Sequence, residues 1–318
     1  MSLMQSLRHW LASGLSLEPA RVAPDGGGQP PLPAAPALPV VRSRRATIDG
    51  VELFWREAGP ADGPAIVLLH GFPSSSHMFR KLIPLLADRF RVIAPDYPGF
   101  GHSSAPADYD WTFDNLAATV DRLLDRLEVR RAVFYMQDYG GPVGMRLAVT
   151  DPARVAGFVI QNANFRMEGV SQAAADVFMP LWQQNDDRNA RQLLTAEMTK
   201  FQYTAGARDP DGLDPDAWTH DQATTLDREG ATERQLALFR DYASNVARYD
   251  AWADWMREHQ PPTLVTWGSG DPFFLVPGAE AMVRELNDAE LHLFDSGHFA
   301  LEEDAAGIAG LIRRRFLA

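Results

Sequence analysis

The segment 132–144 constrains the fold of this chain more than any other, because a short apolar run passes directly into a glycine-rich turn. Residues 132–136 form an uninterrupted apolar run typical of a buried strand. Asp138 follows at once, and Gly140, Gly141 and a stretch with helical spacing come after it. This order predicts a strand, a sharp turn and a helix, with the side chain of Asp138 presented at the tip of the turn.

Apolar runs alternate with helical patterns on both sides of this segment. Strands are expected over 65–69, 90–94, 132–136, 155–160, 263–267 and 290–294, and helices over 78–86, 113–127, 279–286 and the chain end up to 316. Residues 46–48 and 51–55 flank Asp49-Gly50 and predict an antiparallel hairpin at one edge. Such alternation predicts an α/β fold with a mostly parallel, doubly wound sheet covered on both faces.

The alternation stops between residues 165 and 260. Residues 188–203 and 232–255 have helical spacing, and tryptophan and tyrosine are frequent in this region. We therefore expect a helical cap of residues 165–260, inserted into a core made of residues 41–164 and 261–318. Residues 1–40 are rich in Pro, Gly and Ala after a short amphipathic stretch, which predicts a flexible N-terminal arm and leaves export or targeting open.

Composition narrows the classes of partner. The 318 residues carry a net charge of −12, which argues against nucleic acid and anionic membranes, since both require clustered Lys and Arg. The chain has no cysteine and no histidine pattern with metal-ligand spacing, so we expect no cofactor and no metal. No apolar run reaches 18 residues. We expect a cytoplasmic protein that takes a small apolar substrate, and the sequence leaves the oligomeric state open.

Polar residues recur where predicted strands end. His70, Asp96 and Asp138 each follow an apolar run closely, and Asp271 and His298 lie in loops after two later runs. Ligands of parallel sheets bind at the carboxyl ends of the strands, so these side chains are candidates for one site. The chain order Asp138, Asp271, His298 is the order of nucleophile, acid and histidine in α/β-hydrolases.

Four motifs in this order resemble the α/β-hydrolase superfamily, in the branch with an Asp nucleophile and a helical cap that contains epoxide hydrolases and haloalkane dehalogenases. They are His70-Gly71-Phe72-Pro73, Asp96-Tyr97-Pro98-Gly99-Phe100-Gly101, Gln137-Asp138-Tyr139-Gly140-Gly141 and Gly297-His298-Phe299. The resemblance covers residues 46–316. A Gly-x-Ser-x-Gly motif is missing from the sequence, which disfavours a serine hydrolase.

The resemblance implies a two-step reaction. Asp138 would displace a leaving group at an sp³ carbon and form an ester with the substrate. His298, oriented by Asp271, would then take a proton from the water that hydrolyses this ester. The backbone N–H groups of Phe72 and Tyr139 would form the oxyanion hole.

The resemblance also separates the candidate activities. Haloalkane dehalogenases usually carry Trp after the nucleophile and a polar residue at the position of Phe72, whereas Tyr139 and Phe72 stand here. Epoxide hydrolases commonly have an aromatic residue at this second position and use cap tyrosines to hydrogen-bond the epoxide oxygen. Tyr242 matches such a tyrosine best and Tyr203 second best, with core packing as the alternative for both. We expect an epoxide hydrolase; the alternatives are a haloalkane dehalogenase and a non-hydrolytic member that binds a small ligand.

Other residues near the motifs are expected to be structural. His70 is expected to brace the oxyanion loop, and Asp96 to tie its own loop by hydrogen bonds. Glu302 and Glu303 are expected to form a solvated first turn of the last helix, and Asp271 has helix capping as an alternative role. Met136 departs from the pattern, because the residue two before the nucleophile is usually small. Either the turn is slightly opened or a neighbouring side chain is reduced.

Overall fold

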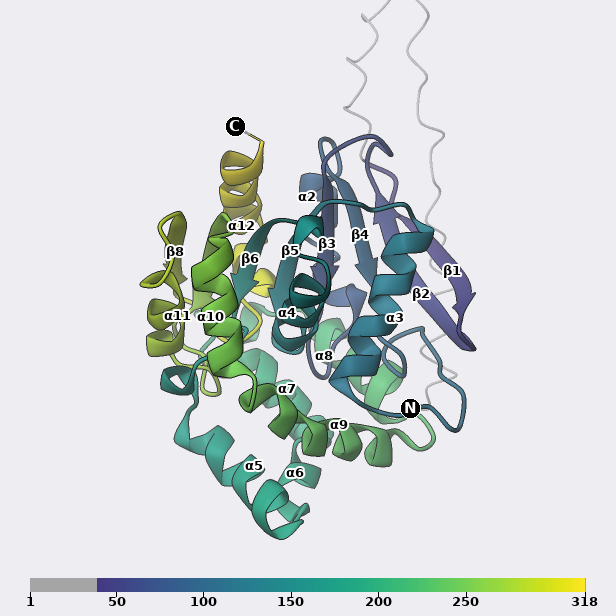
Figure 1. Ribbon diagram of the computed structural model, residues 1–318. Coiled ribbons are helices and arrows are strands. Elements are labelled where there is room, and N and C mark those ends of the chain that lie inside the picture. The colour runs from purple at the N-terminus through teal and green to yellow at the C-terminus, as the bar shows by residue number, and fades with distance from the viewer. Residues whose placement is uncertain (1–38, 318) are drawn as a thin grey trace, which may run out of the picture. The chain divides into compact units, whose positions relative to one another are not determined.

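The computed structural model describes residues 39–317, so the arm expected over residues 1–40 lies almost entirely outside the described part of the chain. One eight-stranded sheet has the order β1-β2-β4-β3-β5-β6-β7-β8 (Figure 1). Its strands are β1 (Arg42–Ile48), β2 (Val51–Ala58), β3 (Ala65–Leu69), β4 (Arg91–Pro95), β5 (Ala132–Gln137), β6 (Val155–Gln161), β7 (Thr263–Gly268) and β8 (Ala289–Phe294). Strands β1 and β2 are antiparallel to each other, β2 is antiparallel to β4, and the remaining neighbours are parallel. The predicted sheet is confirmed.

The helices alternate with the strands as the sequence predicts. They are η1 (Ser76–Phe79), α2 (Ile83–Leu86), α3 (Phe113–Arg126), α4 (Gly140–Thr150), η2 (Pro152–Arg154), η3 (Met167–Gly169), α5 (Gln172–Gln184), α6 (Arg188–Gln192), α7 (Ala196–Thr204), η4 (Pro210–Gly212), α8 (Asp216–Asp221), η5 (Gln222–Leu226), α9 (Ala231–Val246), α10 (Tyr249–His259), α11 (Val276–Val283) and α12 (Leu301–Phe316). The helix expected over 78–86 is divided into η1 and α2, and α11 begins three residues before the expected start.

The first hairpin forms at the predicted place. Asp49 has a φ of 49° and Gly50 a φ of 81°, so both turn residues adopt the left-handed conformation that a tight two-residue hairpin requires. The register pairs Ile48 with Val51 across this turn. The turn chemistry therefore fixes which faces of β1 and β2 meet the rest of the sheet.

Two apolar layers cover the sheet. On one face, α3, α4 and α10 pack against side chains of the central strands; on the other, η1, α2 and α12 do the same (Figure 1). Successive side chains of β5 point to opposite faces of the sheet, since Phe134 packs in the first layer and Tyr135 in the second. The sheet is therefore doubly wound, which places its strand ends, rather than its faces, within reach of a ligand.

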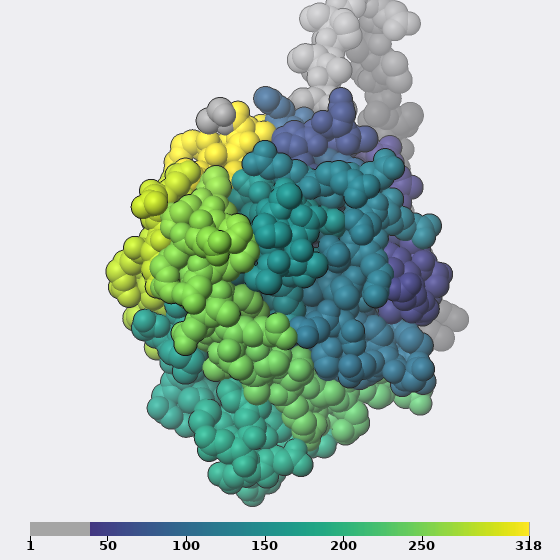
Figure 2. Space-filling model, in the orientation of Figure 1, coloured from purple at the N-terminus to yellow at the C-terminus, as the bar shows by residue number. Residues whose placement is uncertain are grey.

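Between β6 and β7 every regular element of the structure is helical, as expected for the predicted cap. The expected helix 188–203 is divided into α6 and α7, because Thr195 caps a new helix by accepting a hydrogen bond from Met198 N at 3.3 Å. The expected helix 232–255 is divided into α9 and α10. Helix α5 has no counterpart among the expected helices. In Figure 2, α9 and α10 form a continuous green band beside teal α5 and α6.

Helix α10 belongs to the layer that covers the sheet. Its Trp255 ring lies 6.0 Å from the ring of Phe158 in β6. The predicted cap of residues 165–260 therefore includes one helix that packs as part of the core, and the helices that stand over the strand ends finish with α9. We call the segment 165–248 the cap segment.

The helices of residues 39–317 include none that is long and apolar enough to cross a membrane.

Candidate active site

Asp138 stands at the tip of a strained turn between β5 and α4. Its φ is 48°, a left-handed conformation that is uncommon for a residue with a side chain. Glycine is required around it: a Cβ at Gly140 would clash with the carbonyl oxygen of Leu69, and a Cβ at Gly71 would clash with Asp138 itself. The predicted strand, turn and helix are confirmed, and the strain is concentrated at the residue with the candidate chemistry.

Met136 fits the turn because its neighbour on α4 is small. A Cβ at Gly144 would clash with the sulfur of Met136, so the helix approaches the strand only because Gly144 has no side chain. Of the two explanations offered by the sequence, a reduced neighbouring side chain is thus the one observed. The methionine fills the volume that a larger residue on α4 would otherwise occupy.

The carboxylate of Asp138 is held by backbone N–H groups. Phe72 N donates to Asp138 Oδ1 at 2.6 Å, and the N–H of Tyr139 also bonds the carboxylate. The residue is buried, with 8% of its surface exposed. Burial raises the pKa of Asp138, and the nearby His298 and the two N–H groups oppose that shift. The predicted oxyanion donors therefore surround the predicted nucleophile.

His298 lies between two carboxylates. Its Nδ1 lies 2.7 Å from Asp271 Oδ2, and its Nε2 lies 3.9 Å from Asp138 Oδ2. Burial lowers the pKa of His298, but Asp271 and Asp138 outweigh this effect and raise the pKa above its ordinary value. The structure thus brings the three residues together, with Nε2 directed towards the candidate nucleophile. Gln137 also approaches this nitrogen, at 3.0 Å from its Nε2.

Asp271 is oriented by a residue that the sequence did not single out. Asn162 follows β6, has a φ of 43°, and its amide donates to Asp271 Oδ2 at 2.8 Å. The other oxygen of Asp271 accepts bonds from Phe273 N at 2.8 Å and Phe274 N at 3.1 Å. Asp271 therefore orders its own loop as well as His298. Asn162 could have been noticed by its position, since it follows a strand end as Asp138 does.

His70 and Asp96 have the expected structural contacts. His70 Nδ1 lies 3.0 Å from Gly71 O, and His70 Nε2 accepts from Tyr97 N at 3.0 Å. Burial lowers the pKa of His70 to about 4, so the ring is neutral near pH 7. Asp96 accepts bonds from the backbone N–H groups of Ser76 and His102, each at 2.8 Å. His70 thus braces the loop that carries Phe72.

The expectation of a solvated first turn of the last helix, made for Glu302 and Glu303, is wrong for Glu302. Glu302 is buried and accepts a bidentate pair from Arg80 at 2.8 and 2.9 Å, and Lys81 Nζ lies 2.9 Å away. Glu303 is half-buried and accepts from the backbone N–H groups of Arg208 and Asp209. Both carboxylates face the positive end of α12 and join distant segments.

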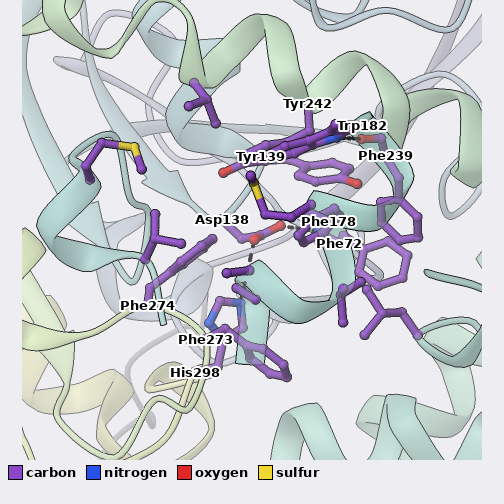
Figure 3. A pocket seen from close by; sticks show the side chains of 18 of the residues that line it. Phe72, Asp138, Tyr139, Phe178, Trp182, Phe239, Tyr242, Phe273, Phe274 and His298 are labelled. Atoms are coloured by element: carbon purple, nitrogen blue, oxygen red, sulfur yellow. Dashed lines mark hydrogen bonds and ion pairs between the residues drawn. The ribbon is translucent and has the colours of Figure 1, made fainter. Parts of the chain in front are cut away.

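A largely apolar cavity of about 180 Å³ opens between the strand ends and the cap segment (Figure 3). Asp138, Tyr139 and His298 lie at its core side. The cap segment contributes apolar side chains and Tyr242, and helix α5 supplies Phe178 and Trp182 among others. The helix that the sequence did not predict therefore forms one wall of the candidate site.

Tyr242 faces this cavity, as predicted, and a second tyrosine accompanies it. The hydroxyl of Tyr242 is buried and makes no hydrogen bond to a described residue. Burial, the neighbouring Tyr249 and the charge of Asp138 raise the pKa of Tyr242 well above its ordinary value. Burial and Asp138 likewise raise the pKa of Tyr249, to about 12. Tyr249 was not proposed from the sequence, although it follows Tyr242 by seven residues, or about two helical turns.

Tyr203 was the weaker candidate, and it does not line the cavity. Its ring stacks on Phe299 with centroids 3.8 Å apart, and its hydroxyl donates to Asp221 Oδ2. The side chain is 2% exposed and packs between the cap segment and the core. This is the packing role considered as its alternative.

Across residues 39–317, no group of three or more His, Cys, Asp or Glu side chains is arranged to hold a metal ion.

Comparisons with known proteins agree with this fold. Residues 64–305 match the family model described as alpha/beta hydrolase fold. An uncharacterized hydrolase of Saccharomyces cerevisiae is 42% identical over 267 residues, which is 82% of this chain and 92% of the yeast protein. A haloalkane dehalogenase of Psychrobacter cryohalolentis is 40% identical, but over only 33% of this chain and 36% of that protein.

Solved structures show the same architecture. The epoxide hydrolase CorEH superposes with a TM-score of 0.73 at 20% identity, and covers 87% of this chain and 99% of its own. At that identity the likeness concerns the fold. The family match includes every strand from β3 to β8, and the alignment with the yeast relative extends over most of the chain. The chain belongs to the alpha/beta hydrolase fold family.

Proposed function

We propose that this hydrolase opens an epoxide to a vicinal diol through a covalent ester at Asp138. Asp138 Oδ2 attacks an epoxide carbon, a new C–O bond forms, and the ring C–O bond breaks. The released oxygen takes a proton from a tyrosine hydroxyl, for which Tyr242 is placed best. Tyr242 is suited to this donation because it lines the cavity and its hydroxyl is protonated near pH 7.

The second step returns Asp138 to its starting state. His298 Nε2 takes a proton from water while the water oxygen attacks the carbonyl carbon of the ester. The negative oxygen that develops is stabilised by the N–H groups of Phe72 and Tyr139, where one donor contributes roughly 3 kcal/mol. Collapse breaks the C–O bond between the ester carbonyl carbon and the substrate, and the diol oxygen receives the proton from His298. The second proton of the water passes from the Asp138 carboxyl to the tyrosinate left by the first step, so both residues return to their starting states. One water and one epoxide give one diol.

The observation that carries this proposal is the unpaired hydroxyl of Tyr242 across the cavity from Asp138. The hydroxyl has no protein partner among the described residues, yet it is buried and lines the cavity that contains the carboxylate. A leaving oxygen attached to the substrate would fill the missing hydrogen bond. A halide needs no proton from the protein, so tyrosine hydroxyls favour the epoxide.

Haloalkane dehalogenation is the second candidate. It is supported by the 40% identity to a haloalkane dehalogenase over a third of the chain, and Asp138 and His298 would have the same roles. The hydroxyl of Tyr139, which is also buried and unpaired, is available to a halide. A non-hydrolytic, ligand-binding role is disfavoured by the contacts of His298 with both carboxylates.

A side-by-side screen of terminal epoxides and haloalkanes, with diol and halide both measured, tests the proposal. We expect diol formation, and halide release without epoxide turnover would instead favour dehalogenation. In His298→Gln the ester should accumulate. With an epoxide its mass exceeds that of the protein by the full substrate mass, whereas a haloalkane adduct lacks the halogen. Asp138→Asn is the control that should carry no adduct. Absence of any adduct with a substrate that turns over contradicts the covalent mechanism.

A further inference from the structure

One polar side chain of the cavity has no place in the reaction described above. Fourteen of the twenty residues that line the cavity are apolar. The polar ones are Asp138, His298, three tyrosines and Gln202. Among the described lining residues, Gln202 is thus the one polar side chain that is neither a tyrosine nor one of the pair Asp138 and His298.

Gln202 is buried and lacks a partner. Its residue is 4% exposed, and its Nε2 is buried without a hydrogen bond to any described residue. It lies on α7, whereas the tyrosines of the cavity lie just before α4, on α9 and on α10. The residues beside it point elsewhere: Tyr203 bonds Asp221, and Phe201 is exposed and packs on Phe273. Gln202 therefore lines the cavity from a different helix than the tyrosines.

A buried amide N–H without a partner is costly, and a bound acceptor removes that cost. The missing partner is an acceptor, since the unpaired atom is the amide nitrogen. It is also uncharged, because no Arg or Lys is among the described residues that line the cavity and Asp138 repels anions. These conditions describe an ether or carbonyl oxygen.

We propose that Gln202 is a specificity-determining residue, which donates a hydrogen bond to an ether or carbonyl oxygen of an otherwise apolar substrate. The proposal rests on the proposed function for the identity of the reacting group. The apolar walls bind the carbon skeleton, and Asp138 and Tyr242 bind the epoxide. Gln202 donates its hydrogen bond to one oxygen at a fixed distance from the reacting carbon. A substrate without that oxygen leaves the amide unpaired and is disfavoured.

An ether scan tests this selectivity. Terminal epoxides with a phenyl end group and one chain length are compared, with an ether oxygen replacing a methylene at each successive position. We expect one position to raise kcat/KM about tenfold over the all-carbon epoxide, as a neutral hydrogen bond would. The preference should disappear in Gln202→Met, which keeps the length of the side chain. Gln192→Met, an exposed glutamine at the end of α6, is the matched control and should keep the preference.

Binding separates this proposal from the proposed function. The same ethers with a methyl group in place of the epoxide cannot react, and their affinities can be compared with those of the all-carbon analogues by calorimetry. A position-dependent preference that Gln202→Met removes supports the role of Gln202 even if no epoxide is turned over. Turnover of epoxides with no preferred oxygen position, or a preference that survives in Gln202→Met, overturns the role of Gln202 and leaves the proposed function standing.

Discussion

At the residue scale, the site combines a paired charge system with unpaired hydroxyls. Asp271 bonds His298, which lies 3.9 Å from Asp138, whereas the hydroxyls of Tyr139 and Tyr242 are buried without partners in the described chain. Leaving a buried hydroxyl unpaired costs about 1–3 kcal/mol. The protein retains these groups, which is understandable if a substrate oxygen pairs with them during the reaction.

The tyrosines can therefore be assigned by substitution. Tyr242→Phe should slow ester formation from an epoxide by roughly 10²-fold or more, because it removes a proton donor. Tyr249→Phe should have a smaller effect in the same direction, since Tyr249 lies beside Tyr242. Tyr203→Phe should keep the rate, because its hydroxyl bonds Asp221 outside the cavity.

Single-turnover measurements of ester formation in the His298→Gln background provide the test. Equal losses in Tyr242→Phe and Tyr203→Phe would argue that the effect is structural and not chemical. Turnover of a haloalkane is a further comparison, since loss of a proton donor should affect halide release much less.

The titration of His298 provides a second residue-level prediction. Its pKa is raised, with Asp271 as the largest upward influence. The base must be neutral to accept a proton, so hydrolysis of the ester should slow as the pH falls through that pKa. Asp271→Asn removes the upward influence and should lower the pKa. NMR titration of His298 in both proteins measures it, and a value below 6.5 in the wild type would contradict the geometry described for the site.

At the element scale, the sequence predicts most of what carries the chemistry. Continuous apolar runs identify the central strands, the alternating segment 290–294 identifies β8, and the candidate residues follow these segments, so the amino-acid order groups Asp138, Asp271 and His298. Helix α5 could not be predicted. It contains Pro180, and its buried residues are few, so its apolar side chains line a cavity instead of forming a regular stripe.

The packing of α4 on β5 can be tested through Met136 and Gly144. Gly144→Ala should destabilise the protein by about 1–3 kcal/mol, because the new methyl group clashes with the Met136 side chain. Combining it with Met136→Ala should cost less than the sum of the two single changes, since each relieves the other. Denaturant unfolding of the three variants measures the coupling.

Gly310→Ala is the matched control for that experiment. Gly310 is also helical, but nothing lies within 4 Å of a Cβ placed there. Alanine at this position should stabilise the protein by roughly 0.5–1 kcal/mol, because a helical glycine has more conformational freedom to lose. Additive effects of Met136→Ala and Gly144→Ala would show that the two side chains do not share the space.

At the scale of the whole molecule, the cap segment rests on the core through buried titratable groups. Burial raises the pKa of Asp221 on α8 to about 7, and Tyr203 donates a hydrogen bond to it. Glu302 and Arg80 also act on this carboxyl. His77 of the core stacks on His220 of the cap segment with ring centroids 4.1 Å apart. Burial lowers the pKa of His77 to about 3.

These shifts act on stability in opposite directions. The pKa of Asp221 is higher in the folded than in the unfolded state, so its contribution is complete below pH about 4 and is lost as the pH rises through about 7. Asp221→Asn imitates the protonated acid. It should raise the Tm at pH 8 by roughly 2–4 °C, the effect of about 1 kcal/mol in a domain of this size.

At pH 4 the same substitution should change the Tm little, because Asp221 is then protonated in the folded wild type. Scanning calorimetry at both pH values gives the comparison, and the contribution of His77 is common to both proteins. A stabilisation that is equal at pH 4 and pH 8 would show that ionisation of Asp221 is not its cause.

Contacts of the cap segment explain why the sequence alone could not assign the roles of some residues. Tyr242 and Tyr203 were proposed and Tyr249 was not, because helix periodicity places residues on a face without saying what that face meets. The side chain of Tyr203 turns towards Phe299 and Asp221, whereas Tyr249 begins α10 at the cavity wall. Glu302 was misjudged for the same reason, since its partner Arg80 is 222 residues away in sequence.

The insertion of the cap segment has a consequence for how such a protein can change over generations. Arg166 Nη1, just after the chain leaves β6, donates to Tyr249 O at 3.5 Å, where α10 begins, so the two ends of the insertion lie side by side. The wall that faces the substrate is therefore encoded largely in one uninterrupted stretch of the gene with adjacent endpoints. Replacement of that stretch can exchange the wall, Tyr242 included, and leave Asp138, Asp271 and His298 in place.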